Sequence, residues 1–198
     1  MKKVSWCVKV AMLSAVAVVL MLIEFPLPFI APPFYKLDFS ELPVLLGGFA
    51  LGPLAAVVIE FIKVLLNLLI NGTITMGVGE SANFIVGVAF VLPAAVIYKR
   101  NRTKVSAITG LIVGGIVMVV LGAFVNAYLL IPAYGSALHM EMSQFVDMGR
   151  AIHPSIDSLL KLVLLCVVPF NALKVIIVSV ITMFIYKPLS PIIKGKTK

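Results

Sequence analysis

The chain has 198 residues, of which 62% are hydrophobic and 12% are charged, and its formal net charge at pH 7 is +8. Its mean hydropathy is +1.16, and ordinary soluble domains carry about 25% charged residues, so the composition excludes a soluble domain and indicates an integral membrane protein. Nucleic-acid binding is excluded as well, because most basic residues gather at the chain ends and at one connection, not on a face of a soluble fold.

A chain of this length supplies about six membrane spans of roughly 20 residues each. We predict an all-α integral membrane protein, a single membrane domain over residues 1–198, with six transmembrane helices over residues 4–24, 41–50, 54–70, 80–98, 105–130 and 156–186. The second helix is short because Gly47-Gly48 and Gly52-Pro53 break it. The last is long, and we expect it to tilt or to break near Pro169.

A proline-rich segment, residues 25–43, separates the first two predicted helices. Four prolines between Pro26 and Pro33 remove backbone donors and disfavour helix in the residues before them. Irregular backbone cannot face lipid, so the segment lies outside the bilayer or lines a protein-walled cavity. It also carries the aromatic residues Phe25, Phe29, Phe34, Tyr35 and Phe39. We therefore predict an outer lid loop over a flat ligand.

The distribution of charge predicts the orientation of the chain. Six spans place both termini on one side, and basic residues gather at the termini and in the connection 99–104, whereas most acidic residues lie at the opposite helix ends. Because positively charged connections stay in the cytoplasm, we predict a multi-pass protein of the plasma membrane with both termini cytoplasmic. The proline-rich segment, the turn 72–79 and the connection 132–155 then share the outer face.

Polar residues inside membrane spans are costly and usually face a cavity or a partner. Asn171 and Lys174 are three apart, so they share one face of the last helix and present an amide and a cation at one spot. Lys174 could instead pair with Glu60. Glu60 and Lys63 are also three apart, which favours an internal ion pair or a contact with a protein partner over ligand binding.

Further candidates lie at the outer helix ends. Asn126 and Tyr128 lie near the end of the fifth helix, and Glu80 and Asn83 at the start of the fourth, so the four could converge below the outer loops. Alternatively, Glu80 complements the helix N-terminus and Asn83 bonds to a neighbouring helix.

Catalytic and metal-binding patterns are absent. His139 and His153 match no metal-ligand spacing, and Cys7 and Cys166 lie in apolar stretches as inert thiols. Gly195-Lys-Thr197 has no glycine five positions before it and follows no strand, so it is not a phosphate-binding loop. We predict a protein that is not an enzyme and that holds no metal and no resident cofactor.

Two helices carry small residues four positions apart, a spacing that lets another helix approach closely. The first helix has Ala11 and Ala15, and the fifth has Gly110 and Gly114. Each pattern fits either internal packing or a partner interface.

Several runs resemble one known family over most of the chain. They are Phe25-Pro-Leu-Pro-Phe29, residues 37–53, Glu60-Phe-Ile-Lys63, Gly79-Glu-Ser-Ala-Asn83, Asn126-Ala-Tyr128 and Pro169-Phe-Asn-Ala-Leu-Lys174. The family is the riboflavin-specific substrate-binding subunit, or S component, of energy-coupling factor (ECF) vitamin transporters. The resemblance implies that the vitamin binds near the outer face under the loop between the first two helices. It also implies partners: a transmembrane coupling subunit, on which Ala11 and Ala15 would dock, and two ATPase subunits.

Riboflavin would be the transported substrate, and its chemistry fits the candidate residues. Its flat ring would stack on aromatic or apolar surface, and its heteroatoms and ribityl hydroxyls need amide, carboxylate and ammonium partners. The predicted substrate-binding residues are Leu37, Asp38, Phe39, Glu80, Asn83, Asn126, Tyr128, Asn171 and Lys174. A phosphorylated flavin would favour arginine, and the outer half holds only Arg150, so the sequence favours the neutral vitamin, with flavin mononucleotide as an open alternative.

Three other functions fit the sequence less well. A stand-alone ion-coupled transporter would use Glu60 and Lys63 as its coupling pair. An S component for another vitamin, such as thiamine, biotin or folate, would keep the same architecture. A small enzyme acting on lipid would need a catalytic constellation, which the sequence lacks.

Overall fold

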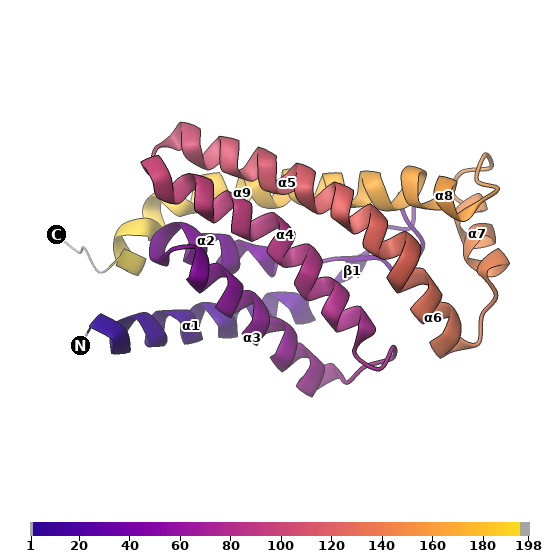
Figure 1. Ribbon diagram of the computed structural model, residues 1–198, viewed down its shortest axis with the longest axis horizontal. Helices are drawn as coiled ribbons and strands as arrows, with labels where there is room; N and C mark the ends of the chain where they lie inside the picture. Colours follow the sequence, from indigo (N-terminus) through magenta and orange to yellow (C-terminus); the bar gives the residue numbers. More distant parts are fainter. Residues whose placement is uncertain (1, 195–198) are drawn as a thin grey trace.

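The computed structural model describes residues 2–194, in which long helices run side by side along the long axis (Figure 1). The helices are α1 (Lys2–Leu22), α2 (Glu41–Leu51), α3 (Pro53–Asn71), α4 (Val78–Asn101), α5 (Lys104–Val125), α6 (Ile131–Leu138), α7 (Met142–Arg150), α8 (Leu159–Leu162) and α9 (Val168–Lys194). Two π-helical turns, η1 (Asn126–Leu130) and η2 (Val163–Val167), connect α5 to α6 and α8 to α9. Two short strands, β1 (Phe25–Pro26) and β2 (Lys36–Leu37), lie between α1 and α2.

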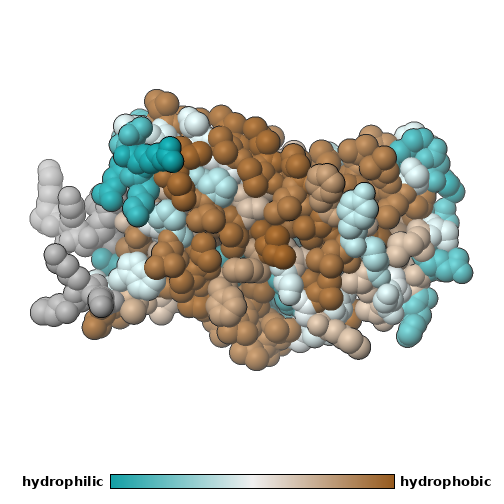
Figure 2. Space-filling view, in the orientation of Figure 1, coloured by the Kyte–Doolittle hydropathy of each residue, from teal (hydrophilic) through white to brown (hydrophobic). Residues whose placement is uncertain are grey.

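Within residues 2–194, five helical stretches are long and apolar enough to cross a membrane. They are Val4–Leu22, Pro53–Asn71, Val78–Asn101, Lys104–Leu138 and Leu159–Pro188. Apolar side chains form a broad belt over the middle of the molecule, and polar ones gather at its ends (Figure 2). The helix α2 has 11 residues and extends about 16 Å, roughly half of a hydrocarbon core of about 30 Å. Five of the six expected spans therefore have the required length, and the second does not.

The short helix α2 lies at the centre of the bundle, where it packs against α1, α3, α4 and α9. At Gly48 a Cβ atom would lie 3.0 Å from the Cβ of Ala95 and 3.1 Å from that of Ala56, so the glycine allows three helices to approach closely. Glu41, at the start of α2, is only 2% exposed. The segment before α2 must therefore enter the bundle, and this places Asp38, Ser40 and Glu41 in its interior.

The proline-rich segment is anchored on protein. The strands β1 and β2 pair antiparallel, with Phe25 opposite Leu37. The ring of Phe34 contacts Tyr134 and Phe145 at centroid distances of 5.9 and 5.7 Å, and that of Tyr35 contacts Phe170 at 5.8 Å. The irregular backbone thus packs against α6, α7 and α9, as the membrane environment requires.

Two proline-containing helices continue where the sequence predicted an end or a break. Helix 105–130 was expected to stop before Pro132, yet it continues through η1 and α6 to Leu138. Likewise, Pro169 lies inside a continuous helix that begins at Leu159. Proline lacks an N–H and crowds the carbonyl four residues earlier, and in both helices a wider π-helical turn precedes it. The prediction missed this accommodation.

The connection 132–155, which was expected between two helices, is itself partly helical. Besides α6, it contains α7, which begins with a capping box in which Glu141 and Gln144 satisfy each other's backbone N–H groups. The beginning of α1, the end of α9 and the α4–α5 connection lie at one end of the molecule, and α6 and α7 lie at the other (Figure 1). We refer to the latter as the α6–α7 end.

Candidate functional site

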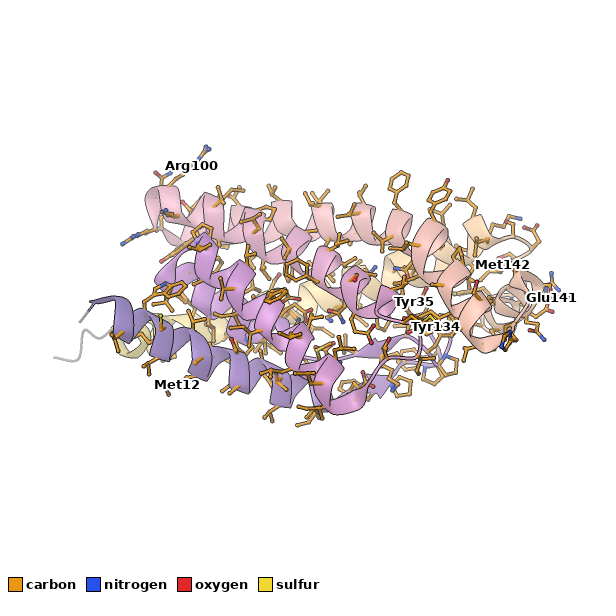
Figure 3. The ribbon with its side chains drawn as sticks, turned by 60° about the horizontal axis from the view of Figure 1, so that its bottom comes forward. Met12, Tyr35, Arg100, Tyr134, Glu141 and Met142 are labelled. Atoms are coloured by element: carbon orange, nitrogen blue, oxygen red, sulfur yellow. The ribbon has the colours of Figure 1, made fainter. Side chains whose placement is uncertain are left out.

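A cavity of about 460 Å³ opens between the proline-rich segment, α3, α4, η1 and α9. Its size falls within the range of about 300–1,000 Å³ that is usual for small-molecule sites. The four ring-bearing residues that line it are Phe34, Tyr35, Tyr134 and Phe170. Figure 3 shows Tyr35 and Tyr134 close together, toward the end that carries Glu141 and Met142 and away from Arg100. The cavity therefore belongs to the half of the molecule near the α6–α7 end.

Six of the predicted substrate-binding residues line this cavity. They are Asp38, Glu80, Asn83, Asn126, Asn171 and Lys174. They come from the proline-rich segment, α4, η1 and α9, so the topology brings together side chains up to 136 positions apart.

The other three predicted residues do not line the cavity. Leu37 is buried in an apolar cluster that other residues of the proline-rich segment share, and Phe39 contacts the ring of Phe25. Tyr128 is 78% exposed and stacks on Phe124 at a centroid distance of 6.2 Å. Because Asn126 and Tyr128 are two positions apart on a helical turn, their side chains lie on opposite sides.

Tyr134 and Phe170 are lining residues that the prediction missed. Tyr134 lies in α6, within the connection 132–155 for which no helix was predicted, so its position could not be deduced from helical spacing. Phe170 had a usable signal, because it stands next to Asn171 in a run that carries the family resemblance and contains two predicted site residues. Both add ring surface to the cavity wall.

The hydroxyl of Tyr35 holds the proline-rich segment against η1. It donates a hydrogen bond to Asn126 Oδ1 at 2.7 Å, and Asn126 Nδ2 donates to the carbonyl of Gly122 at 2.7 Å. Burial raises the pKa of the Tyr35 phenol, so this group stays a neutral donor. The side chain of Asn126 is therefore occupied on both its oxygen and its nitrogen.

Lys174 is held in the cavity wall by two carboxylates. Its Nζ lies 2.9 Å from Asp38 Oδ2 and 3.0 Å from Glu41 Oε2. The suggested partner Glu60 lies instead beside Lys63, with an Nζ–Oε1 distance of 2.7 Å. Burial opposes ionisation of Asp38, but the charges of Lys174 and Lys63 outweigh it and lower the pKa of Asp38 from 3.8 to about 2. Asp38 is therefore a carboxylate at neutral pH.

Unused hydrogen-bonding capacity remains on the cavity wall. An ammonium group has three donors, and Lys174 meets two carboxylates, with no third acceptor among residues 2–194. The amide of Asn171, 7% exposed, packs over Gly122 and makes no hydrogen bond within the described chain. Donors and acceptors without partners, in a cavity that aromatic rings also line, suit a flat molecule with a polar edge.

The mouth of the cavity carries two further polar contacts. Lys36 and Glu24 form an ion pair across the base of the proline-rich segment, and Thr73 Oγ1 donates to Glu80 Oε2 at 3.0 Å. Neither His139 nor His153 lines the cavity. Among the described residues no three His, Cys, Asp or Glu side chains are grouped so that they could hold a metal ion.

The structure separates the two patterns of small residues. Gly110 and Gly114 face α4, where added Cβ atoms would lie 2.7 Å from the Ala94 carbonyl oxygen and 2.2 Å from the Phe90 carbonyl oxygen. That pattern serves internal packing. Ala11 and Ala15 lie on the exposed face of α1, so this pattern is free to meet another helix.

Comparison with known proteins gives consistent similarities. The sequence pattern of the family described as "ECF transporter, substrate-specific component" matches residues 7–186. "Riboflavin transporter RibU" of Staphylococcus aureus (strain TCH60) is 37% identical over 190 residues, 94% of this chain and 91% of that protein. "Riboflavin transporter FmnP" of Bacillus subtilis (strain 168) is 35% identical over 191 residues, 96% of this chain and 94% of that protein.

A solved structure is similar over nearly its whole length. It is described as the S component of a bacterial ECF transporter, and it superposes with a TM-score of 0.75 at 36% sequence identity, covering 97% of this chain and 99% of its own. The sequence and the fold therefore point to the same group of proteins.

Proposed function

Because this chain belongs to the family of substrate-specific components of ECF transporters, we propose that it binds riboflavin in the cavity and passes it to an ATP-driven transporter. One observation carries the proposal: aromatic rings line the cavity together with the uncommitted polar groups of Asn171 and Lys174. Riboflavin has a flat ring with a polar edge and a polyhydroxyl tail, and these need a stacking surface and several hydrogen-bonding partners.

The substrate-binding residues we propose are those that line the cavity. Asn171, Lys174 and Asp38 would meet the polar edge of the ring, and Glu80 and Asn83 the ribityl hydroxyls. Asn126 is held by Tyr35, so it would contact the vitamin only if that hydrogen bond is exchanged. Leu37, Phe39 and Tyr128 are outside this set because they do not line the cavity.

The charge of the cavity favours the neutral vitamin over its phosphate. Four carboxylates line it, from Glu24, Asp38, Glu41 and Glu80, against two ammonium groups, from Lys36 and Lys174. No arginine is among the lining residues. A phosphate group would therefore meet net negative charge without the bidentate donor that it usually binds.

The remaining parts of the proposal concern the membrane and the partners. Both termini would lie in the cytoplasm, since Lys99, Arg100, Arg102 and Lys104 lie at their end of the bundle. The α6–α7 end would then face outward, with the proline-rich segment as the lid. The exposed Ala11 and Ala15 would receive the transmembrane coupling subunit. That subunit would associate with the two ATPase subunits, which hydrolyse ATP.

The test begins with the detergent-purified chain and a titration that follows quenching of flavin fluorescence. We expect saturable binding of one riboflavin per chain and weaker binding of flavin mononucleotide. An excess of thiamine or biotin should not displace the bound riboflavin. The second step measures uptake into proteoliposomes with and without the coupling and ATPase subunits. We expect uptake only with all subunits and ATP. Absence of quenching would refute riboflavin as the substrate. Concentrative uptake by the chain alone would refute transport that depends on the coupling and ATPase subunits.

A further inference from the structure

Five buried ionisable side chains form an unbranched chain of contacts that ends at the cavity. In order they are Glu60, Lys63, Glu41, Lys174 and Asp38, so negative and positive groups alternate. The four Nζ–oxygen distances along it are 2.7, 3.4, 3.0 and 2.9 Å. All five residues are at most 8% exposed. Lys174, Asp38 and Glu41 line the cavity, whereas Lys63 and Glu60 do not.

Lys63 is fully buried and does not line the cavity. Its Nζ donates to Ser40 Oγ at 3.1 Å and to Glu41 Oε1 at 3.4 Å, and it lies 2.7 Å from Glu60 Oε1. Lys174, by contrast, meets two carboxylates. Of the two ammonium groups, Lys174 is therefore the one that lines the cavity, and the described residues offer it no third acceptor.

Glu60 is the terminal member, and its surroundings give it no role of its own in binding. Its side chain is fully buried, and neither of its oxygens has a hydrogen-bonding partner among the described residues. The short distance to Lys63 Nζ is therefore an electrostatic contact whose angle is not that of a hydrogen bond. The carboxylate also fills the space beside Gly87 on α4, where a Cβ atom would lie 2.0 Å from Oε1.

A buried carboxylate loses its hydration, so it destabilises the fold unless a nearby positive charge compensates for that loss. The charge of Glu60 offsets part of the charge of Lys63. Without it, Lys63 would draw closer to Glu41, its other carboxylate partner among the described residues, and Glu41 also holds Lys174. The position of Lys174 in the cavity wall thus depends on a residue that does not touch the cavity.

We propose that Glu60 and Lys63 are positioning residues, which fix Glu41 so that Lys174 presents its free N–H to the substrate. This inference rests on the proposed function of the cavity as the riboflavin site. It predicts that Glu60 acts on affinity only through Lys174, over a path of three ion-pair contacts. If Glu60 had a purely structural role, its replacement would change the stability of the fold, and its effect on riboflavin affinity would be the same with lysine or methionine at position 174.

The experiment is a double-mutant cycle on riboflavin affinity, read by fluorescence quenching. Glu60→Gln keeps the shape and removes the charge. We expect it to weaken binding by about tenfold in the natural background and by less than about twofold in the Lys174→Met background, because coupled residues are non-additive. We also expect the absorption bands of bound flavin to shift in Glu60→Gln. Thr182→Val, at a fully buried site on α9 outside the cavity, is the matched control. It should change neither the riboflavin affinity nor the absorption bands of bound flavin.

A second variant guards against loss of folding. Replacing both members of a buried pair by apolar residues is often neutral or stabilising, so Glu60→Met with Lys63→Met should recover the thermal stability. We expect its riboflavin affinity to stay about tenfold reduced, because Glu41 then loses its anchor. Recovery of affinity together with stability would overturn the inference, and so would equal effects of Glu60→Gln in both backgrounds.

The unmodified chain separates the two levels of the proposal. If it fails to bind riboflavin, the proposed function and the inference both fall. If it binds and Glu60→Gln binds equally well, only the inference falls.

Discussion

Replacing Lys174 by methionine tests the polar wall of the cavity most sharply. Methionine keeps the length of the apolar stem, so the change removes the ammonium group and little packing. The lost group has two carboxylates within 3.0 Å and one uncommitted N–H toward the cavity. A hydrogen bond from a charged donor contributes about 1.5–3 kcal/mol, so we expect riboflavin affinity to fall by roughly 10- to 150-fold.

The same change has a separate effect on stability. It leaves Asp38 and Glu41 buried without their shared cation, and breaking a buried ion pair destabilises by about 3–5 kcal/mol. Adding Asp38→Asn should restore part of the stability, because it removes one of the two stranded charges. It should not restore affinity, since the N–H donor is still missing.

The assay is titration of detergent-purified protein with riboflavin, together with a thermal unfolding curve without ligand. Lys161→Ala is the control. Lys161 lies on the same continuous helix as Lys174, but it is exposed, pairs with Asp157 and lies outside the cavity. Its affinity should equal that of the unmodified chain. If Lys174→Met is folded and binds riboflavin as tightly as that control, Lys174 does not contact the substrate and the assignment of the polar wall is wrong.

Three further predictions concern other parts of the molecule. The pKa of Asp38 is lowered to about 2 in the folded chain, so as the pH falls Asp38 is protonated in the unfolded chain before it is protonated in the folded chain. The free energy of unfolding should therefore fall by about 2 kcal/mol between pH 4 and pH 2. Unfolding curves of Asp38→Asn, measured over the same pH range, should lack this loss. Gly87→Ala places a Cβ 2.0 Å from Glu60 Oε1 and should destabilise by about 1–3 kcal/mol, measured as a lower Tm; an unchanged Tm would show that Glu60 can move freely. Ala11→Leu with Ala15→Leu should spare riboflavin binding but abolish copurification with the coupling subunit, and normal copurification would reject this interface.

The sequence predicted best what depends on local spacing. Asn171 and Lys174 were expected on one face because they are three apart, and both line the cavity. The long apolar runs likewise located the spanning helices. The same rule should have excluded Tyr128, since a residue two positions from Asn126 lies on the opposite side of its helical turn.

What the sequence could not predict depends on contacts between distant elements. The partner of Lys174 is Asp38, 136 positions away, and no spacing rule selects it over Glu60. The π-helical turns before Pro132 and Pro169 were equally hidden, because a proline is compatible either with the end of a helix or with a widened turn. Tyr134 lines the cavity only because the first of these turns lets the helix continue.

The most direct measurement of the central claim is the visible absorption spectrum of the protein purified in detergent from cells supplied with riboflavin. After free flavin is removed, we predict a yellow protein that releases one equivalent of riboflavin per chain on denaturation, and a Lys174→Met variant that releases much less. A colourless protein that takes up no flavin when riboflavin is added back would contradict the claim that this cavity is a riboflavin site.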